Sequence, residues 1–273
     1  MSDSSFPKTA QNSVNRHRER GHYDEDTIHS IINATPVAHV SFVPDPSNPV
    51  PVILPMIARI GKFRDDDAPC CYVHGYVSAR MFRLPDQPGG GGGGGGEGVP
   101  VCIAATQVVN FVLALTPFNH SYDYRSAVVH GHAELLDPVA DRDENLWAME
   151  LITDGIVPRR WENTRIPPDD TEIASTRILR VRIDGASAKI RDSGVKDDRK
   201  DMKNTEVRER VWTGVIPYHE TLGTPVPDEK NLVKEVPGYI TDYIREHNQR
   251  SRRGAENNEG GIVRRVIGSL LGS

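Results

Sequence analysis

The spacing of apolar residues predicts one helix near the start of the chain. Ile28, Ile31 and Ile32 fall on a single helical face, and Asp24 stands where its side chain would cap the first turn. Pro36 disfavours helical backbone at Thr35, so the helix should end there. A helix is therefore expected over about residues 24–35.

Short apolar runs bounded by turn residues follow this helix and predict strands. Val37–Val43 and Val50–Ile60 flank the turn cluster Pro44–Pro49, and the three segments together predict an antiparallel hairpin. Apolar and arginine residues alternate over Leu179–Ile183, which is typical of a strand with one buried and one wet face. Further strands are expected over Cys70–His74, over Ser126–Leu136, and within Val99–Leu115 as two strands with a tight bend near Val109 and Asn110.

Helices and connections are expected around these strands, which gives a mainly β fold with flanking helices. Asp137 and Pro138 form a cap and first-turn pair for a helix to about Thr153. A short helix from about Ser78 to Leu84 would turn its first N–H groups toward Gly75. The charged segment Asp197–Arg210 predicts an exposed loop or helix. The segment Trp212–Pro217 that follows is expected to be buried.

The composition predicts one domain with extended ends. The chain has 273 residues, 37% of them hydrophobic, which is enough for one substantial core. We expect a polar N-terminal arm over residues 1–22, the domain over 23–220 with a flexible glycine-rich insertion over 89–98, and a C-terminal extension over 221–273. Apolar pairs in residues 262–271 form a short helical stripe that needs a protein or membrane surface to be stable.

Charge and cysteine content limit the classes of partner and compartment. The formal net charge of −5 is spread along the chain without a broad basic face, which argues against nucleic acid as the main partner. Three cysteines without metal-ligand or disulfide spacing, no apolar leader and no stretch of about 20 apolar residues predict a soluble protein of a reducing, cytoplasmic compartment. The neighbouring Cys70 and Cys71 are either a redox pair or small residues beginning a strand.

Two clusters of polar and aromatic residues suggest a ligand that carries phosphate. One is Tyr72-Val-His-Gly-Tyr-Val-Ser-Ala-Arg-Met81, and the other is Phe118-Asn-His-Ser-Tyr-Asp-Tyr-Arg-Ser126, which leads into Val128-Val-His-Gly-His132. His74 is a candidate proton donor or a hydrogen-bonded structural residue. His120, His130 and His132 bring no Cys or carboxylate that completes a metal-ligand set, so no metal site is predicted.

Six sequence blocks, taken in order over about residues 16–220, carry a resemblance to a known family. They are Arg20-Gly-His-Tyr23, Tyr72-Val-His-Gly75 with Ser78-Ala-Arg-Met81, Phe118–Ser126, Val157-Pro-Arg-Arg-Trp161, Ser187-Ala-Lys-Ile-Arg191 and Trp212-Thr-Gly-Val-Ile-Pro217. In order and spacing the chain resembles the pyridoxamine 5′-phosphate oxidase-like superfamily, and within it the nitroimidazole-resistance type of flavin-nucleotide-binding protein. The resemblance implies a split β-barrel that forms a homodimer and holds FMN at the subunit interface.

The resemblance also implies which residues bind FMN. Ser78 and Arg80 would hold the phosphate, and His74 and Gly75 would adjoin the ring. The ring would lie along the backbone of Ile53, Leu54, Pro55 and Met56, and further contacts would come from Arg125, Ser126, Lys189 and Trp212. Arg125 is either a phosphate clamp or a carboxylate partner, and Trp212 either a cofactor contact or core. Relatives carry Ser directly before the arginine, where this chain has Ala79, so one hydroxyl contact is lost or moved.

Three functions follow from these expectations. The first is an FMN-dependent oxidoreductase that passes electrons from reduced nicotinamide to a small acceptor such as a nitro compound, a quinone or a flavin, with His74 as the catalytic residue. The second is a non-catalytic flavin-nucleotide-binding protein. The third is a haem-binding protein on the same fold.

Overall fold

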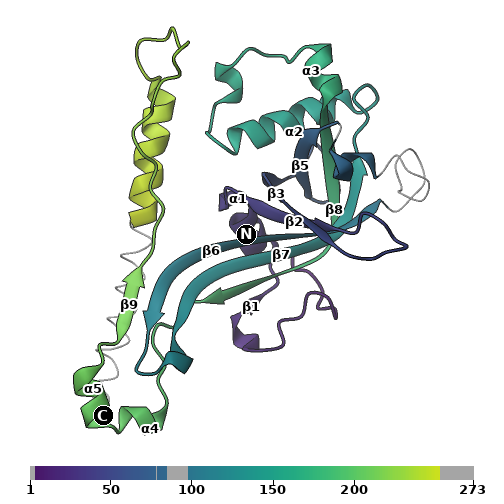
Figure 1. Ribbon diagram of the computed structural model, residues 1–273. Coiled ribbons are helices and arrows are strands. Elements are labelled where there is room, and N and C mark those ends of the chain that lie inside the picture. Colours follow the sequence, from purple (N-terminus) through teal and green to yellow (C-terminus); the bar gives the residue numbers. More distant parts are fainter. Residues whose placement is uncertain (1–3, 78, 85–97, 253–273) are drawn as a thin grey trace. The chain divides into compact units, whose positions relative to one another are not determined.

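A curled antiparallel sheet organises the computed structural model, which describes residues 4–77, 79–84 and 98–252 (Figure 1). Seven strands follow in the order β3-β2-β6-β7-β8-β5-β4, with β1 paired to β8 and β9 paired to β6. The strands are β1 (Gly21–His22), β2 (Ala38–Phe42), β3 (Val52–Met56), β4 (Ala58–Gly61), β5 (Cys70–Tyr76), β6 (Val99–Leu113), β7 (Ser121–Leu135), β8 (Thr176–Arg191) and β9 (Gly214–Pro217).

The helices are short and flank the strands. They are α1 (Glu25–Ala34), α2 (Arg142–Asp154), α3 (Asp170–Ser175), α4 (Arg199–Met202) and α5 (Thr205–Arg210), together with the 3₁₀ turns η1 (Arg18–Arg20), η2 (Arg80–Arg83), η3 (Pro117–Asn119) and η4 (Trp161–Asn163). A further helix occupies residues 238–252. The prediction of a mainly β fold with flanking helices is confirmed.

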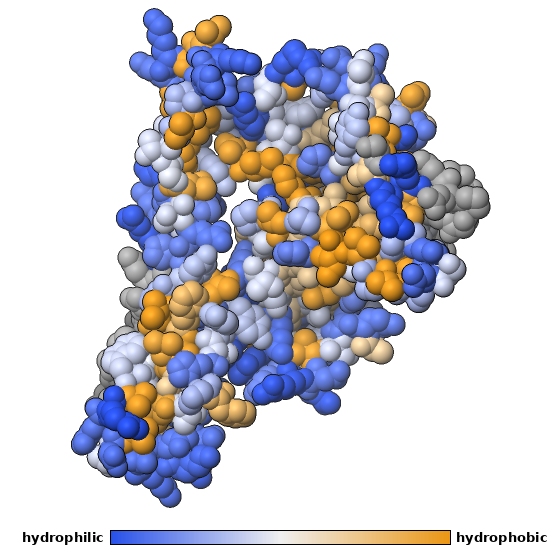
Figure 2. Space-filling model, viewed as in Figure 1, coloured by the Kyte–Doolittle hydropathy of each residue, from blue (hydrophilic) through white to orange (hydrophobic). Residues whose placement is uncertain are grey.

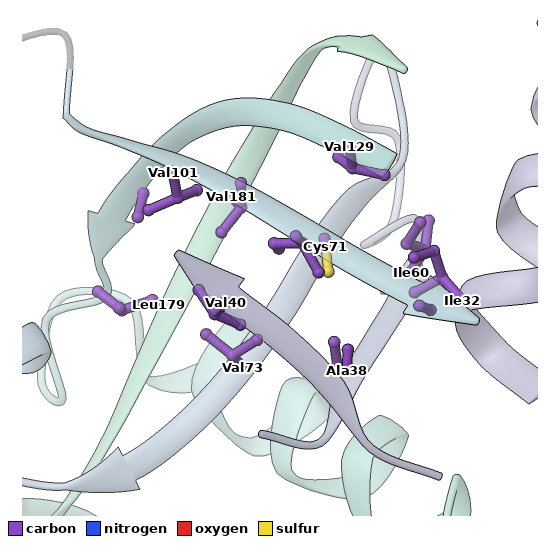
Figure 3. Packing of buried hydrophobic residues seen from close by; sticks show 14 of the residues in the cluster. Ile32, Ala38, Val40, Ile60, Cys71, Val73, Val101, Val129, Leu179 and Val181 are labelled. Carbon is purple, nitrogen blue, oxygen red and sulfur yellow. The ribbon is translucent and has the colours of Figure 1, made fainter. Parts of the chain in front are cut away.

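The order of strands brings the two ends of the sheet close together, although the end strands do not pair with each other. β3 and β4 stand at opposite ends of the path, yet a single residue, Ile57, joins them in the chain. Chain continuity therefore brings the two outer strands together, as closure into a barrel requires. Tight packing fills the inside: Val40, Val73 and Leu179 come from three different strands and are fully buried (Figure 3).

Two compact units make up the chain. The first contains Met1–Thr106 and Ser126–Lys189, and the second contains Gln107–Arg125 and Ile190–Ser273. The first unit holds the barrel core, α1 and α2. The second holds the far ends of β6 and β7, β9, and the C-terminal segments.

The helix predicted from the isoleucine stripe is confirmed. Asp24 caps α1 by accepting a hydrogen bond from the backbone N–H of Thr27 at 2.8 Å, and the helix ends at Thr35. Ile28 and Ile32 are fully buried. The N-terminal residues contact the same unit, because Asn12 donates to the carbonyl of Ala186 at 3.2 Å and β1 pairs with β8.

Several predicted boundaries differ from those of the structure. Val50–Ile60 is not one strand, because its first part pairs with β2 and its second part with β5. The two strands expected within Val99–Leu115 are one: β6 continues through Asn110, which pairs with Pro217 of β9. The helix predicted to begin at Asp137 begins at Arg142 instead, because Asp137 accepts hydrogen bonds from Val139 and Ala140 in a turn that precedes it.

The remaining expectations divide in the same way. β5, β7 and β8 confirm the strands predicted at Cys70, at Ser126 and at Leu179, although β7 begins five residues earlier, at Ser121. Asp197–Arg210 contains the two short helices α4 and α5. The glycine run Gly89–Gly96 and the apolar tail over residues 262–271 lie outside the described residues, as does Ser78. No helix of the described residues is long and apolar enough to cross a membrane.

Candidate functional site

The strand β3 presents an open edge to solvent. It pairs only with β2, so its other row of backbone N–H and C=O groups has no strand partner among the described residues. Leu54 and Met56 pack against the core, whereas Ile53 is 60% exposed and Pro55 is exposed. Proline removes one N–H from a ladder and is tolerated at such an edge. The edge is suited to contact a flat ligand.

The end of β5 lies next to the end of β3. Ala58 of β4 pairs with Val73 of β5. Met56, the last residue of β3, is two residues before Ala58, and His74 is the residue after Val73. His74 is partly buried, and its Nδ1 has no hydrogen-bond partner among the described residues. Burial lowers the pKa of His74, so the imidazole is neutral near pH 7. A neutral ring with an unused nitrogen can exchange a proton or a hydrogen bond with a ligand.

The turn after β5 is shorter and tighter than expected. A helix from Ser78 to Leu84 is not present: the described residues form the 3₁₀ turn η2, which begins at Arg80 after Ala79. Phe82 of this turn covers Gly75, since a Cβ at Gly75 would lie 2.3 Å from Phe82 Cε2. Glycine is therefore required at this position for the turn to pack on β5.

Arg80 is an exposed cation at the start of this turn. Hydrogen bonds from Ser47 lower the pKa of Asp45, and the charge of Arg80 adds to that effect, which places Arg80 on the side of the β2–β3 loop. Arg80 forms no ion pair with another residue that the structure describes. It is thus available to an anionic ligand.

Arg177 belongs to the same region and was missed by the sequence analysis. It pairs with Gly75 across β5 and β8, and its Nε is buried without a hydrogen-bond partner among the described residues. The backbone N–H of Val77 donates to the carbonyl of Ser175 at 3.1 Å, so the two segments run side by side. The sequence pattern that predicted this strand is the alternation of apolar residues with Arg180 and Arg182, and it does not include Arg177.

Ser126 and Lys189 lie together, but at a different place along the sheet. The hydroxyl of Ser126 donates to the carbonyl of Lys189 at 3.2 Å. Lys189 stands twelve residues along β8 from Arg177 (189 − 177) and pairs with Gly21 of β1. Two of the sequence blocks, one around Gly21 and one around Lys189, are thereby neighbours.

Comparison with known proteins decides the family. The family model described as pyridoxamine 5′-phosphate oxidase matches residues 24–190. The chain belongs to this family. The match runs from α1 to the last residues of β8, leaving out only β1 and β9 among the strands, and confirms the family predicted from the six sequence blocks.

Two solved structures share the fold of this chain, and a third is less similar. The flavocytochrome Anf3 from Azotobacter vinelandii is 28% identical, with 86% of this chain and 97% of that chain covered and a TM-score of 0.67. The FAD and heme binding protein from Mycobacterium smegmatis is 21% identical, with 82% and 97% covered and a TM-score of 0.66. A protein of Bacteroides thetaiotaomicron described as a putative 5-nitroimidazole antibiotic resistance protein is 18% identical, with 62% and 86% covered and a TM-score of 0.45. No curated protein matches the chain. The split-barrel prediction is confirmed.

Arg125 and Trp212 lie in the second compact unit of this chain. Arg125 is exposed on β7. Trp212 is 66% exposed and its ring covers Gly214, whose Cβ would lie 2.6 Å from Trp212 Cη2. The buried character expected for Trp212–Pro217 is therefore wrong for this chain, since Ile216 is also 47% exposed.

The remaining histidines and cysteines form no metal site among the described residues. His130 and His132 share one face of β7, and His132 Nδ1 lies 2.5 Å from Asp184 Oδ2. All three cysteines are free, and burial raises the pKa of the Cys70 thiol to about 11 and that of Cys71 to about 12. These shifts disfavour the thiolate, the form needed for redox chemistry.

Proposed function

We propose that this chain binds FMN in its first unit and acts as a flavin-dependent oxidoreductase. The observation that carries the proposal is the cationic turn η2, which Phe82 holds against β5 by packing over Gly75 and in which Arg80 is exposed without an ion pair to another described residue. Such a turn presents a guanidinium fork to a phosphate. The membership of the family and the likeness to a flavocytochrome at 28% identity support the same class of ligand.

The residues of the first unit fit a flavin nucleotide in three respects. Arg80 would bind the phosphate, and Ser78, two residues earlier in the sequence, is proposed as a second contact. The open edge of β3 over Ile53–Met56 would lie along the ring, where backbone N–H groups can hydrogen-bond polar ring atoms. His74 has a buried nitrogen without a partner among the described residues, as a residue that faces a ligand would have.

The flavin, when bound, supplies hydride and electron transfer from reduced nicotinamide to a small acceptor. The chain's own part is to orient the ring along β3 and to exchange a proton at His74 Nδ1. A neutral imidazole can accept that proton, and its lowered pKa favours giving it up again. The acceptor belongs to the class of nitro compounds, quinones or flavins.

A second copy of the chain would complete the site. Lys189 lies twelve residues along β8 from Arg177, and Ser126 of β7 is hydrogen-bonded to Lys189, so a single chain does not gather all the proposed flavin contacts at one place. The second unit carries Arg125 and Trp212 and exposes apolar side chains over β9, where Figure 2 shows them at the surface. We propose a homodimer in which these residues, with Ser126 and Lys189, reach the partner's flavin.

Two further attributes belong to the proposal. Three free cysteines suit a reducing compartment, so we propose the cytoplasm. Haem is a second candidate ligand, because the similar structures include a flavocytochrome and a FAD and heme binding protein. Of the histidine nitrogens among the described residues, those of His29 and His74 are buried without a partner, which leaves His74 as the candidate near the proposed site.

The test begins with the ligands of the purified protein. Heat release followed by mass spectrometry identifies FMN, FAD or no flavin, and the absorption spectrum separates flavin bands from a haem Soret band. Oxidation of reduced nicotinamide by the FMN-loaded protein, in the presence of a quinone or a nitroaromatic compound, supports the oxidoreductase. Flavin binding without turnover favours the non-catalytic alternative, and failure to bind flavin overturns the proposal.

A further inference from the structure

We propose that Arg177 is a second phosphate-binding residue of the flavin site, an inference that rests on the proposed function. Its position follows from the register of β5 and β8, in which Arg177 pairs with Gly75. Residues opposite one another in an antiparallel pair project to the same face of the sheet. Arg177 therefore lies on the face of β5 that Phe82 covers.

The turn that carries Arg80 is packed on this pair of strands. Phe82 belongs to η2, two residues after Arg80, and its ring lies over the backbone of Gly75, the residue that pairs with Arg177. The N–H of Val77 donates to the carbonyl of Ser175, which holds the chain leading into the turn against the start of β8. Arg80 belongs to the turn that packs on Gly75, and Arg177 is the strand partner of Gly75, so the two arginines belong to different segments of the first unit that meet at this residue.

The guanidinium of Arg177 is incompletely partnered. Its Nε is buried and makes no hydrogen bond to any described residue. The charge of Arg177 acts on Asp137, whose carboxylate already accepts hydrogen bonds from Val139 and Ala140 at 2.8 Å each. These two hydrogen bonds, more than the charge of Arg177, hold the pKa of Asp137 below its usual value. A buried donor without an acceptor is costly, and a phosphate oxygen would satisfy it.

The sequence around the turn makes a second cation useful. The residue directly before Arg80 is Ala79, which offers no hydroxyl donor to a ligand at the start of the turn. A phosphate dianion is held best by several charged donors from different directions. Arg177 supplies such a donor from β8, beside a turn residue that has none.

The experiment compares FMN with riboflavin, which has the same ring and no phosphate. Flavin affinities of the full chain and of Arg177→Gln are measured by quenching of flavin fluorescence. A lost hydrogen bond to a charged group corresponds to a fall in affinity of roughly tenfold or more, so the FMN affinity of Arg177→Gln should drop by about that factor. The riboflavin affinity should stay unchanged.

Arg182→Gln is the matched control, because it removes the same charge from the same strand at an exposed position paired with Glu134 and Asp184. It should leave both affinities unchanged. If Arg177→Gln does not fold, as judged by circular dichroism, Arg177→Lys replaces it and should show a smaller but selective loss for FMN.

The outcomes separate this inference from the proposed function. Unchanged FMN affinity in Arg177→Gln, with flavin still bound by the unaltered chain, overturns the inference alone. An equal loss for FMN and riboflavin also overturns it, because it would mark Arg177 as a structural partner of Asp137. If the unaltered chain binds neither flavin, the proposed function and the inference fall together.

Discussion

The ring of Phe82 lies directly over Gly75. A Cβ at Gly75 would stand 2.3 Å from Phe82 Cε2 and 2.7 Å from Cζ, and Phe82 is only 2% exposed. Because Gly75 has no side chain, the turn η2 can pack closely on β5 at this residue. This contact sets the position of the turn and of Arg80 within it. Stability and ligand binding are coupled at this contact.

Gly75→Ala should destabilise the protein and weaken FMN binding. The added methyl group forces Phe82 away from β5, and overpacking of this kind costs about 1–3 kcal/mol of unfolding free energy. Urea denaturation measures the loss. Gly185→Ala, on β8, is the control, because its Cβ would meet only Asn12 Nδ2 at 3.4 Å. Adding Phe82→Leu to Gly75→Ala should recover part of the stability, and no recovery would contradict the packing argument.

Tyr72→Phe should destabilise the protein without changing its fold. Tyr72 is fully buried, its hydroxyl donates to Glu144 Oε1 at 2.8 Å, and Glu144 Oε2 accepts from Arg180 at 3.0 Å. Removing the hydroxyl leaves one oxygen of a buried carboxylate without its donor, at a cost of about 1.5–3 kcal/mol. Tyr76→Phe, on a side chain that is 65% exposed, should change the unfolding free energy by less than about 0.5 kcal/mol. Equal losses in the two variants would refute the prediction.

The unfolding free energy should fall as the pH drops below about 6.5, which is the pKa of histidine in an unfolded chain. Burial lowers the pKa of His74 and of His29, so the folded state binds fewer protons than the unfolded state in this range. The unfolding free energy therefore rises with pH until the unfolded histidines are neutral. Urea denaturation of the flavin-free protein at several pH values should show a weaker decline for His74→Gln, and weaker still for the double variant with His29→Gln. If the unfolding free energy of the double variant declined at low pH as steeply as that of the unaltered chain, the two histidines would not be the cause of the decline.

Substitutions on the apolar face of the second unit should weaken the proposed dimer. Phe111 stacks on Tyr218 with ring centroids 5.6 Å apart and meets Tyr122 edge-on at 5.4 Å, yet all three rings are at least 37% exposed, as is Ile216. Such an exposed aromatic cluster is typical of interfaces. Ile216→Ser should raise the dimer dissociation constant in size-exclusion chromatography with light scattering. Val139→Ser, at an 83% exposed position of the first unit, should leave it unchanged, and a monomeric unaltered chain would contradict the proposal.

Local sequence signals located the elements whose contacts are local. The stripe of Ile28, Ile31 and Ile32 and the cap at Asp24 are properties of a few neighbouring residues, and both were predicted correctly. The path of β6 was not, because Asn110 is held by long-range contacts: its side chain donates to Asp123 at 3.1 Å and its backbone pairs with β9. Sequence alone does not show these partners, and a polar residue in an apolar run was interpreted as a bend.

The candidate site was predictable only in part for the same reason. The motif around His74 and Arg80 can be seen in one stretch of the sequence, and the structure pairs the β5 part of that stretch with β4, which follows β3 after one residue. Arg177 is indistinguishable in the sequence from the solvated arginines of β8, and only its register with Gly75 and its buried Nε set it apart. The exposure of Trp212 reflects packing of the whole second unit, which no local pattern encodes.

The binding of FMN through its phosphate is tested most directly by titrating the purified, flavin-free protein with FMN, beside the variant Arg80→Ala. Flavin fluorescence and absorption report binding, and riboflavin serves as the ligand without phosphate. We predict saturable, equimolar binding of FMN, and a loss of roughly tenfold or more in Arg80→Ala that riboflavin does not show. No spectral change on adding FMN, or equal FMN affinity in Arg80→Ala, would contradict it.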